Sequence, residues 1–442
     1  MKNNQAVKVR FAPSPTGYLH VGSARSAIFN FLFAKKNGGE IILRLDDTDR
    51  QRYKKEYEED IKEGLDWLNI KFDTFYKQSE RKNIYQKKIE QLLDNNYAYI
   101  SKEENIKDGQ KNEVIRFKNP GQEVIFKDLI RGEIKVNTED LGDFVIAKSL
   151  NEPLYHLASV VDDIDMNITH IIRGEDHIVN TPRHILLTKA LGAQEPLYAH
   201  IPLILAPDRS KLSKRHGAVS LNTYRRQGYL SEAFFNFLAT LGWSPQSKYS
   251  QGGTNQEVLS RQELLNKFSL KGIQKGGAIF NIEKLKWLNR EYLKRISSEE
   301  KNSEILRIFE EYNYRQKEKI IKLVPIITER ISVWQDLEEM IKNGEFDYFF
   351  EKPSIDKEML GTTTYLSDLI KLISDLDEKN FSADKIKTQI WDFASEKGRK
   401  EVLWPFRFIL TGKKKSPDPF TIAEILGKKE TLERLEDFVL DK

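Results

Sequence analysis

Two widely separated segments carry the residues best suited to binding a polyphosphate. The first spans residues 10–23, RFAPSPTGYLHVGS, between an apolar run at 7–11 and a helix-like run at 24–36. A turn rich in proline and glycine between a strand and a helix is where nucleotide-binding α/β units hold phosphate. His20 can donate a ring N–H to an anionic oxygen, and Gly22 has no side chain to obstruct a ligand.

The second segment, residues 210–217, reads SKLSKRHG. It places Lys211 and Lys214 three positions apart in a loop between apolar stretches, where they could follow a departing pyrophosphate. A basic cluster by itself is more often a solvated surface patch, and an isolated His-Val-Gly is more often a helix cap. The presence of both segments favours a polyphosphate site formed by the first segment and by a mobile cationic loop in the second.

Composition restricts the class of protein. The chain has 442 residues, enough for about three domains, with 39% hydrophobic and 31% charged residues, as in a soluble globular protein. No apolar run approaches the length of a membrane span, and the first residues lack the apolar core of a signal peptide, so we expect a cytoplasmic protein with no membrane partner. The absence of cysteine excludes disulfides and thiolate metal sites. A net charge of +4 is compatible with an RNA partner met by local basic patches.

The elements needed to position the two segments are predicted from apolar periodicity. The order of strand 7–11, helix 23–36 and strand 40–45 indicates a right-handed parallel βαβ unit. Charged helices are expected at 53–68 and 80–95. Period-two alternation over 96–148 predicts an inserted set of antiparallel strands, after which the strand 168–173 returns the chain to the parallel sheet.

Beyond residue 220 the pattern is helical. Amphipathic helices are predicted at 229–242 and 282–296, and the charged run 297–301 is interpreted as a linker. The last 140 or so residues favour an all-helical region with few strand signals.

Together, the two motifs resemble the His-x-Gly-His and Lys-Met-Ser-Lys-Ser signatures of class I aminoacyl-tRNA synthetases, with Ser23 at the place of the second histidine. The wording of the first motif, and the Lys-Leu-Ser-Lys-Arg form of the second, resemble the bacterial glutamyl-tRNA synthetase family. Further similarity lies in residues 401–407 and 411–419 and in the segment beginning at Ile422.

The resemblance implies an α/β fold followed by helical domains. It places a split Rossmann-like catalytic domain at 1–95 and 149–220 and an inserted α+β acceptor-binding domain at 96–148. A stem-contact domain at 221–297 and a helical anticodon-binding region at 298–442 would follow. The implied reaction is ATP-dependent attachment of L-glutamate to tRNA(Glu) through a glutamyl-adenylate, by a monomer.

The resemblance also implies roles for particular residues. His20, Lys211 and Lys214 would act on the phosphates, and Lys214→Ala should slow adenylate formation far more than it weakens glutamate binding. The ATP site would comprise Pro13, His20, Gly22, Ser23, His177, Leu203, Ser213 and Lys214. The glutamate site would comprise Arg10, Ala12, Ser14, Asp46, Tyr155, Ser159 and Arg173. Lys286, Arg290, Lys413, Lys414 and Lys415 would touch the tRNA. Magnesium would arrive with ATP, and no protein-held metal, zinc included, is expected.

The sequence departs from the family pattern at two of these positions. Asp46 stands where a glutamate is usual, one methylene longer, so its contact with a substrate ammonium could be mediated by water. Ser159 stands where some members have asparagine. Among the remaining polar residues, Asp162, Asp163 and Asp165 are interpreted as solvated or capping carboxylates. The histidines at 156, 170, 184 and 200 are interpreted as ordinary packed or surface residues.

Three other functions remain open. A shorter relative that glutamylates a modified tRNA base would lack the helical C-terminal third. Glutaminyl-tRNA synthetases begin their first motif differently and usually end in β-barrels. A non-catalytic RNA-binding protein would not need His20, Gly22, Lys211 and Lys214 together. Whether tRNA(Gln) is also charged depends on contacts in the helical region, where the resemblance is thinnest.

Overall fold

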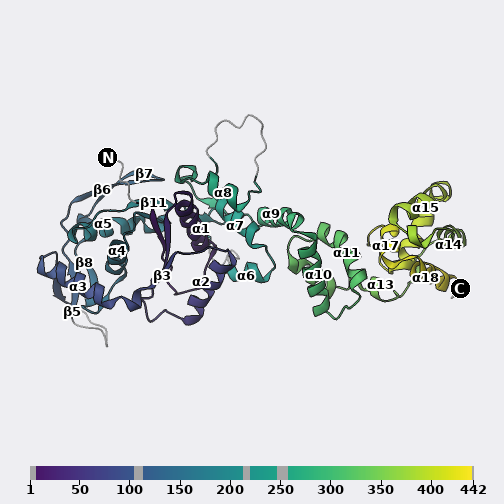
Figure 1. Ribbon diagram of the computed structural model, residues 1–442, viewed down its shortest axis with the longest axis horizontal. Helices are drawn as coiled ribbons and strands as arrows, with labels where there is room; N and C mark the ends of the chain where they lie inside the picture. Colours follow the sequence, from purple (N-terminus) through teal and green to yellow (C-terminus); the bar gives the residue numbers. More distant parts are fainter. Residues whose placement is uncertain (1–5, 104–112, 213–219, 246–256, 441–442) are drawn as a thin grey trace. The chain divides into compact units, whose positions relative to one another are not determined.

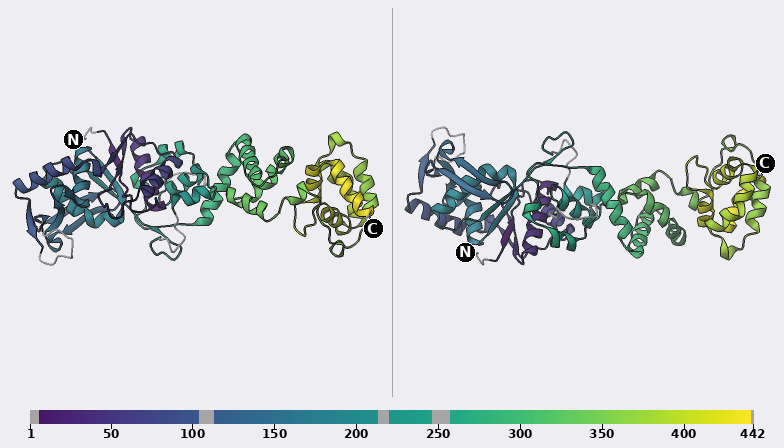
Figure 2. Two further views of the ribbon diagram at one scale, coloured as in Figure 1. Left: turned by 90° about the horizontal axis from the view of Figure 1, so that it is seen from below. Right: turned by 90° about the horizontal axis from the view of Figure 1, so that it is seen from above.

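The computed structural model describes residues 6–103, 113–212, 220–245 and 257–440. The chain forms two compact units, Met1–Asn289 and Arg290–Lys442. The first combines sheets with helices, and the second, green to yellow in Figures 1 and 2, is helical throughout its described residues. No helix of the described residues is long and apolar enough to cross a membrane. The predicted combination of an α/β part with a helical C-terminal part is confirmed, and the finer division into four domains stays a prediction.

A parallel sheet begins the first unit. It contains β1 (Lys8–Phe11), β2 (Glu40–Leu45) and β3 (Thr74–Lys77), with Arg10 opposite Ile42 in register. The helices α1 (Val21–Lys36) and α2 (Lys55–Trp67) connect these strands. Residues 41–45 are all buried, as expected for a parallel strand covered by helices on both faces. The predicted βαβ unit is therefore confirmed to within two residues at each helix end.

The second half of the parallel arrangement follows the insertion. It contains β10 (His170–Gly174) and β11 (Leu197–Ile201), connected by the 3-10 turn Glu175–Asn180 and α5 (Thr181–Ala190). The strand β10 lies beside β1, where the amide of Thr169 donates to the carbonyl of Lys8 at 2.9 Å. The side chain of Asn30 on α1 donates to the carbonyl of Ile172 at 3.0 Å. The first helix is thereby fixed to both halves.

The segment between the two halves is antiparallel, as predicted, but it is not all separate from the parallel sheet. One group pairs β4 (Ala98–Lys102), β5 (Glu113–Phe117), β8 (Phe144–Ser149) and β9 (Glu152–Pro153). The hairpin of β6 (Glu123–Asp128) and β7 (Gly132–Asn137) joins β11 instead, through the parallel pair Tyr198 and Asp128, and lies beside it in Figure 1. The inserted segment therefore supplies a residue, Asp128, to the edge of the parallel sheet. The helices α3 (Lys82–Asp94) and α4 (Tyr155–Asp165) flank the insertion.

The rest of the first unit packs around aromatic residues. Phe234 and Phe237 of α7 (Ser231–Thr240) contact Tyr224 of α6 (Leu221–Arg226) and Phe280. The short strands β12 (Ile204–Leu205) and β13 (Ala278–Ile279) pair in parallel. The helices predicted at 229–242 and 282–296 are confirmed as α7 and α9 (Ile282–Arg295), and α8 (Arg261–Lys267) is a further helix between them.

The second unit contains nine helices in its described residues, and Phe309, Phe346 and Phe406 lie in its core. The predicted linker at 297–301 is wrong. Ser297 is the N-cap of the first helix, and its hydroxyl accepts from the amide of Glu300 at 3.1 Å while the Glu300 carboxylate accepts from the amide of Ser297. In the sequence these residues form a charged run, whereas in the structure they form a capping box that starts a helix. The helices are α10 (Ser298–Glu311), α11 (Lys317–Arg330), α12 (Trp334–Lys342), α13 (Asp347–Phe350), α14 (Leu366–Ser374), α15 (Ala383–Lys397), α16 (Arg399–Thr411), α17 (Pro419–Leu426) and α18 (Lys428–Leu440).

Candidate active site

One cleft of about 1020 Å³ collects the residues predicted to bind ATP and glutamate. It lies at the carboxyl ends of β1, β2 and β10, where ligands of open α/β sheets bind. Its lining includes Arg10, Ala12, Pro13, Ser14, His20, Gly22, Ser23, Asp46, Tyr155, Ser159, Arg173, His177, Leu203 and Lys211. Ser213 and Lys214 lie outside the described residues. Lys211, the other half of the lysine motif, shares this cleft with His20.

His20 is the N-cap of α1. Its Nδ1 accepts hydrogen bonds from the amides of Gly22, at 3.1 Å, and Ser23, at 3.2 Å. A Cβ on Gly22 would lie 3.0 Å from the imidazole, so glycine keeps this cap unstrained. Because Nδ1 is an acceptor, the neutral ring carries its proton on Nε2, which lies 3.0 Å from the Ser23 hydroxyl. Desolvation within the cleft lowers the pKa of His20, with Asp176 opposing and Lys211 reinforcing that shift.

Lys211 lies across the cleft beside a carboxylate. Its Nζ is 3.8 Å from Oδ2 of Asp176, and both side chains are at least half exposed. Because an exposed pair of this kind is weak, the lysine can exchange Asp176 for a more highly charged ligand. The neutral imidazole of His20 and the ammonium group of Lys211 thus face the same cleft, although they are far apart in sequence.

The floor of the cleft is a buried charge network centred on Arg44, which the sequence analysis missed. Arg44 is fully buried; its Nε donates to Oδ1 of Asp46 at 2.7 Å, and its NH1 donates to Oδ1 of Asp163 at 2.7 Å. Arg10 donates to the same Asp163 at 3.0 Å. An arginine in the otherwise apolar strand EIILRL was the available signal, because a buried strand rarely includes an unpaired charge.

The acidic cluster at 162–165 was therefore misinterpreted as solvated. Asp162 and Asp163 are buried, and Asp162 accepts from Arg81 at 2.7 Å, from Gln78 at 2.9 Å and from the Tyr85 hydroxyl. Asp165 is half exposed but pairs with Arg81 at 2.5 Å. Their partners lie some 80 to 150 residues away in sequence, so local spacing did not reveal them.

Asp46 and Ser159 are both engaged by Arg44. Burial raises the pKa of Asp46 to about 6, in spite of the opposing effect of Arg44. Ser159 is also buried, and its hydroxyl accepts from NH2 of Arg44 at 3.3 Å. Both departures from the family pattern thus contact the same arginine.

Arg173 lies among histidines rather than carboxylates. His184, His200 and Thr181 contact its guanidinium, and His156 contacts His184 at 3.2 Å. His184 and His200 are packed, in agreement with the interpretation of these histidines as packed or surface residues, but the fold also gathers them with His156 around one arginine, which the sequence did not indicate. His170 is packed against Phe33, as predicted.

Tyr155 and His177 complete this side of the cleft. The Tyr155 hydroxyl lies 3.1 Å from Nδ1 of His177. Burial and the nearby Arg173 lower the pKa of His177 to about 4, so the ring is neutral near pH 7. This part of the site therefore offers a polar but uncharged wall beside the guanidinium.

The residues predicted to touch tRNA lie on exposed or half-exposed parts of helices and loops. Lys286 and Arg290 are on α9, beside the half-buried Trp287. Lys413, Lys414 and Lys415 are exposed directly after α16, whose last turn ends at Gly412 in a left-handed conformation. The half-buried Trp404 donates from its indole to the carbonyl of Met359 at 3.1 Å.

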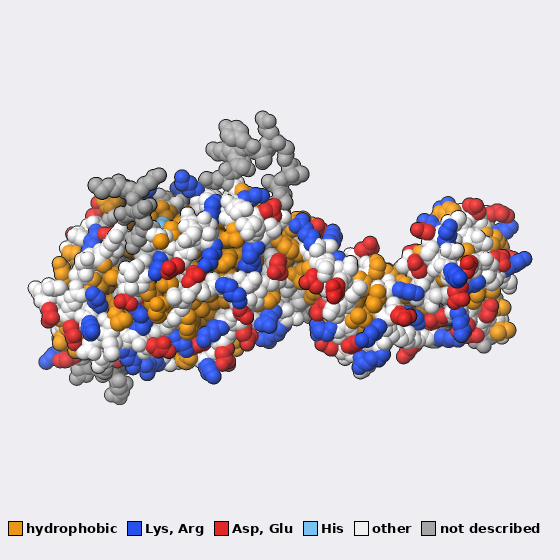
Figure 3. All heavy atoms as spheres, in the orientation of Figure 1, with side chains coloured by type: hydrophobic (Ala, Val, Ile, Leu, Met, Phe, Trp, Pro, Cys, Tyr) orange, Lys and Arg blue, Asp and Glu red, His pale blue; other side chains and the backbone are white. Residues whose placement is uncertain are grey.

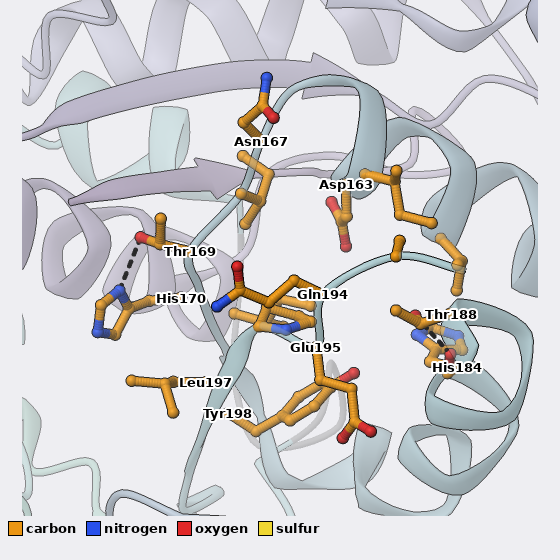
Figure 4. A pocket seen from close by; sticks show the side chains of 16 residues that line it. Asp163, Asn167, Thr169, His170, His184, Thr188, Gln194, Glu195, Leu197 and Tyr198 are labelled. Carbon is orange, nitrogen blue, oxygen red and sulfur yellow. Dashed lines mark hydrogen bonds between the residues drawn. The ribbon is translucent and has the colours of Figure 1, made fainter. Parts of the chain in front are cut away.

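A second cavity, of about 380 Å³, lies behind the arginine cluster (Figure 4). It is bordered by Asp163, His184 and Tyr198, which also contact the arginines, and by the start of β10 and β11. In Figure 4, Gln194 and Glu195 lie between Thr169 on one side and His184 on the other. No residue predicted for substrate contact lies in its lining.

The chain matches two protein-family models. Residues 6–108 and 100–287 match the catalytic domain of class I tRNA synthetases (E and Q), and residues 285–439 match an anticodon-binding domain. A glutamate–tRNA ligase of Thermodesulfovibrio yellowstonii is 37% identical, over 97% of this chain and 98% of the relative. One of Aquifex aeolicus is 48% identical over 66% of this chain and 67% of the relative.

Solved structures give the same result. The crystal structure of a glutamate tRNA ligase from Elizabethkingia meningosepticum, in complex with its amino acid, is similar with a TM-score of 0.87 and 34% identity, covering 99% of both chains. The glutamate-tRNA synthetase of Elizabethkingia anophelis has a TM-score of 0.85 at 34% identity, covering 99% of this chain and all of that one.

Proposed function

This chain belongs to the glutamate–tRNA ligase family of class I aminoacyl-tRNA synthetases, and we propose from that premise that its cleft uses ATP to attach L-glutamate to tRNA(Glu). The observation that carries the proposal is the composition of the cleft. One space contains a buried arginine without a carboxylate partner among the described residues, a buried aspartate, an imidazole donor and a lysine. These are the groups that two carboxylates, one ammonium and a triphosphate require.

For the amino acid, we assign Arg10 and Arg173 to the carboxylates and Asp46 to the ammonium. Tyr155, Ser159, Ser14 and the backbone at Ala12 would complete the glutamate site. A glutamine would present a neutral amide where the site offers a desolvated guanidinium, and leaving that charge unpaired disfavours the wrong substrate by several kcal/mol.

For ATP, we assign Pro13, His20, Gly22, Ser23, His177 and Leu203, together with Ser213 and Lys214, which lie outside the described residues. The described residues contain no group of three metal-ligating side chains, so no residue is assigned to magnesium, which would be carried by the phosphates. Protein-held zinc is not expected.

The reaction needs no covalent enzyme intermediate. The α-carboxylate of glutamate attacks the α-phosphorus of ATP, the bond to the β-phosphate breaks, and pyrophosphate leaves. A hydroxyl of the 3′-terminal adenosine of tRNA then attacks the acyl carbon, gives up its proton, and releases AMP. His20, Lys211 and Lys214 would stabilise the charge that develops on the phosphates, so positioning and electrostatics supply the catalysis.

The helical unit, together with α9 at the end of the first unit, would recognise the rest of the tRNA. Lys286 and Arg290 would contact the inner stem, and Lys413, Lys414 and Lys415 would contact phosphates near the anticodon. The match of residues 285–439 to an anticodon-binding model favours a ligase over the shorter relative that modifies a tRNA base. We propose that the enzyme works in the cytoplasm as a monomer.

ATP–pyrophosphate exchange tests the function. We expect exchange to require both L-glutamate and tRNA(Glu) and not to occur with glutamine. In a charging assay with the same substrates, glutamyl-tRNA should form. Exchange with another amino acid, or glutamylation of an internal base instead of the 3′ end, would contradict the proposal. Parallel charging of purified tRNA(Glu) and tRNA(Gln) measures the tRNA specificity.

A further inference from the structure

Arg173 is fixed entirely by uncharged acceptors. Its Nε donates to Nε2 of His200 and its NH1 to Nδ1 of His184, both at 3.3 Å. Its NH2 donates to the Thr181 hydroxyl at 2.8 Å and to the carbonyl of His177 at 3.4 Å. An arginine has five N–H donors, so one hydrogen on NH1 has no acceptor among the described residues.

The neighbouring arginines are held differently. Arg10 pairs with Asp163, and Arg44 pairs with Asp46 and Asp163. No carboxylate of the described part of the chain forms an ion pair with Arg173, although only 7% of its surface is exposed. A buried cation normally has a counter-charge, so this arrangement needs an explanation.

The tautomer of His200 is set by Asp128. Oδ2 of Asp128 lies 2.7 Å from Nδ1 of His200 and also accepts from its amide at 3.0 Å. Because an ionised carboxylate only accepts, Nδ1 carries the proton and Nε2 presents a lone pair. That lone pair faces Nε of Arg173 and also lies 3.1 Å from the Thr181 hydroxyl, which itself accepts from NH2 of Arg173. Asp128 comes from the inserted hairpin, which explains why the hairpin pairs with β11 at this residue.

The tautomer of His184 follows by the same reasoning. Its Nδ1 accepts from Arg173, so the neutral ring carries its proton on Nε2. Nε2 lies 3.2 Å from Nδ1 of His156, which then accepts. His200 therefore accepts from Arg173 through Nε2, and His184 accepts through Nδ1. The other nitrogen of each ring contacts a different residue, Asp128 for His200 and His156 for His184.

We propose that His200 and His184 are positioning residues that hold Arg173 through ring lone pairs, so that its orientation is fixed while its charge stays free for a carboxylate of the substrate. The inference rests on the proposed function. A carboxylate at either position would hold the guanidinium equally well but would neutralise it and compete with the substrate. A neutral imidazole supplies the geometry without the charge.

The surroundings favour neutral rings. Burial lowers the pKa of His184 and of His200, and the positive charge of Arg173 acts in the same direction. The hydrogen bond that His200 donates to Asp128 opposes the shift at His200. The Tyr198 ring, 5.8 Å from the guanidinium carbon, closes one side of the cluster. The other titratable or charged groups that act on the cluster are Arg10, Arg131, Tyr155, His156, Asp163, His177 and Arg183.

Matched pairs of substitutions isolate the lone pairs. In H200Q, the amide oxygen can take the place of Nε2, whereas H200L has no acceptor there; both lose the bond to Asp128. In H184N, the amide oxygen can take the place of Nδ1, whereas H184L has none; both lose the bond to His156. The difference within the His184 pair therefore reports on the bond to Arg173, and the difference within the His200 pair reports on that bond together with the contact between Nε2 and the Thr181 hydroxyl.

The measurement is tRNA-dependent ATP–pyrophosphate exchange at varied glutamate and varied ATP. A hydrogen bond to a charged group contributes more than a factor of ten to an equilibrium constant. We therefore expect H200L and H184L to raise KM for glutamate about tenfold or more. KM for ATP should change less than about twofold, and H200Q and H184N should recover most of the loss. Equal defects within a pair, or equal rises of both KM values, would overturn the proposal.

The wild-type protein provides a second measurement that does not depend on the variants folding. Imidazole nitrogen shifts from 15N-labelled histidine report the charge and tautomer of each ring. We expect His200 to be neutral with its proton on Nδ1, and His184 to be neutral with its proton on Nε2, at pH 7. A cationic ring or the opposite tautomer at either residue would overturn the proposal. Wild-type protein without glutamate-dependent exchange would instead contradict the proposed function, so the two failures are distinguishable.

Discussion

Arg44 links most of the charges on the floor of the cleft. It contacts Asp46 and Asp163 directly and lies 3.6 Å from Asp162. Burying several ions costs less when they pair with opposite charges, and here Arg10, Arg44 and Arg81 pair with Asp46, Asp162 and Asp163. Asp46 is held by Arg44 and also lines the cleft. The shorter carboxylate is therefore kept in place at a position that borders the substrate space.

Substitution of Arg44 should destabilise the protein strongly. In Arg44→Met, Asp46 loses its paired cation and Asp163 loses one of two, and we expect the free energy of unfolding to fall by about 3–5 kcal/mol. Urea unfolding at pH 7 measures the change. The matched control is Lys71→Met, which removes the cation of an exposed pair with Asp66 and should cost less than about 1 kcal/mol. Similar losses in both variants would contradict the structural role of Arg44.

Asp46 should make glutamate binding sensitive to acid. Its pKa is raised to about 6 by burial, so the carboxylate is ionised above that pH and protonated below it. A protonated Asp46 cannot pair with the ammonium of glutamate, and KM for glutamate should therefore rise up to about tenfold per pH unit as the pH falls through 6. Exchange kinetics between pH 5 and 8 measure the profile.

Two variants control that profile. Asp46→Asn should have a high KM that no longer changes in this range, whereas Asp46→Glu, with the residue usual in the family, should keep a pH-dependent KM. A wild-type KM for glutamate that is flat from pH 5 to 8 would remove Asp46 from the ammonium site.

At the scale of elements, the start of α1 combines a helix cap with the proposed phosphate donor. His20 caps two amides of the helix with Nδ1, while its Nε2 lies 3.0 Å from the Ser23 hydroxyl at the cleft. The helix end also directs its positive dipole toward the cleft, where an anion would bind. The capping and the proposed catalytic function use different nitrogens, so they can be separated by mutation.

His20→Asn and His20→Ala should separate these functions. The asparagine oxygen can replace Nδ1 as a cap but cannot replace Nε2, so stability should be retained while the rate of adenylate formation falls by about two orders of magnitude. Alanine removes both functions and should also cost about 1 kcal/mol of unfolding free energy. Rapid-quench kinetics and urea unfolding measure the two effects, and equal stability losses would contradict the capping role.

Elements whose pattern is local were predictable from the sequence, and contacts between distant elements were not. The helix at 23–36 and the strands at 7–11 and 40–45 were predicted within about two residues, because apolar periodicity and the glycine stop are local signals. The residues proposed for glutamate and ATP were predicted from motifs, and one cleft is lined by those that the structure describes. Arg44, the buried aspartates and the histidines around Arg173 were missed because their partners lie on other elements.

At the scale of the whole molecule, each compact unit has its own core and its own family match. The catalytic model covers residues 6–287 and the anticodon-binding model begins at 285, close to the boundary of the units at 289–290. Basic and acidic side chains are interspersed over the face shown in Figure 3, in agreement with a net charge of only +4. Affinity for a polyanion must therefore come from local basic clusters rather than from the overall charge.

The loop Lys413–Lys415 is the clearest such cluster in the helical unit. Gly412 ends α16 with φ of 63°, and a Cβ there would lie 2.8 Å from the carbonyl of Ser354, so glycine is required for the turn. Arg407 donates to the carbonyl of Lys414 at 3.1 Å and holds the loop against the helix. The three lysines are therefore exposed on a backbone that is held in place.

If the three lysines contact phosphates, their replacement should change the salt dependence of tRNA binding. Each phosphate contact contributes roughly 0.7–0.9 to the slope of log affinity against log salt, so the triple variant with Lys413, Lys414 and Lys415 changed to Ala should lose roughly 2 to 3 from that slope. Filter binding of tRNA(Glu) between 50 and 300 mM salt measures it. The matched control changes the exposed Lys55, Lys71 and Lys82 to Ala, with the same loss of charge. Salt screens the charges of both variants alike. If the slope changes equally in both, the effect comes from net charge; if it changes only in the Lys413–Lys415 variant, phosphates contact this loop.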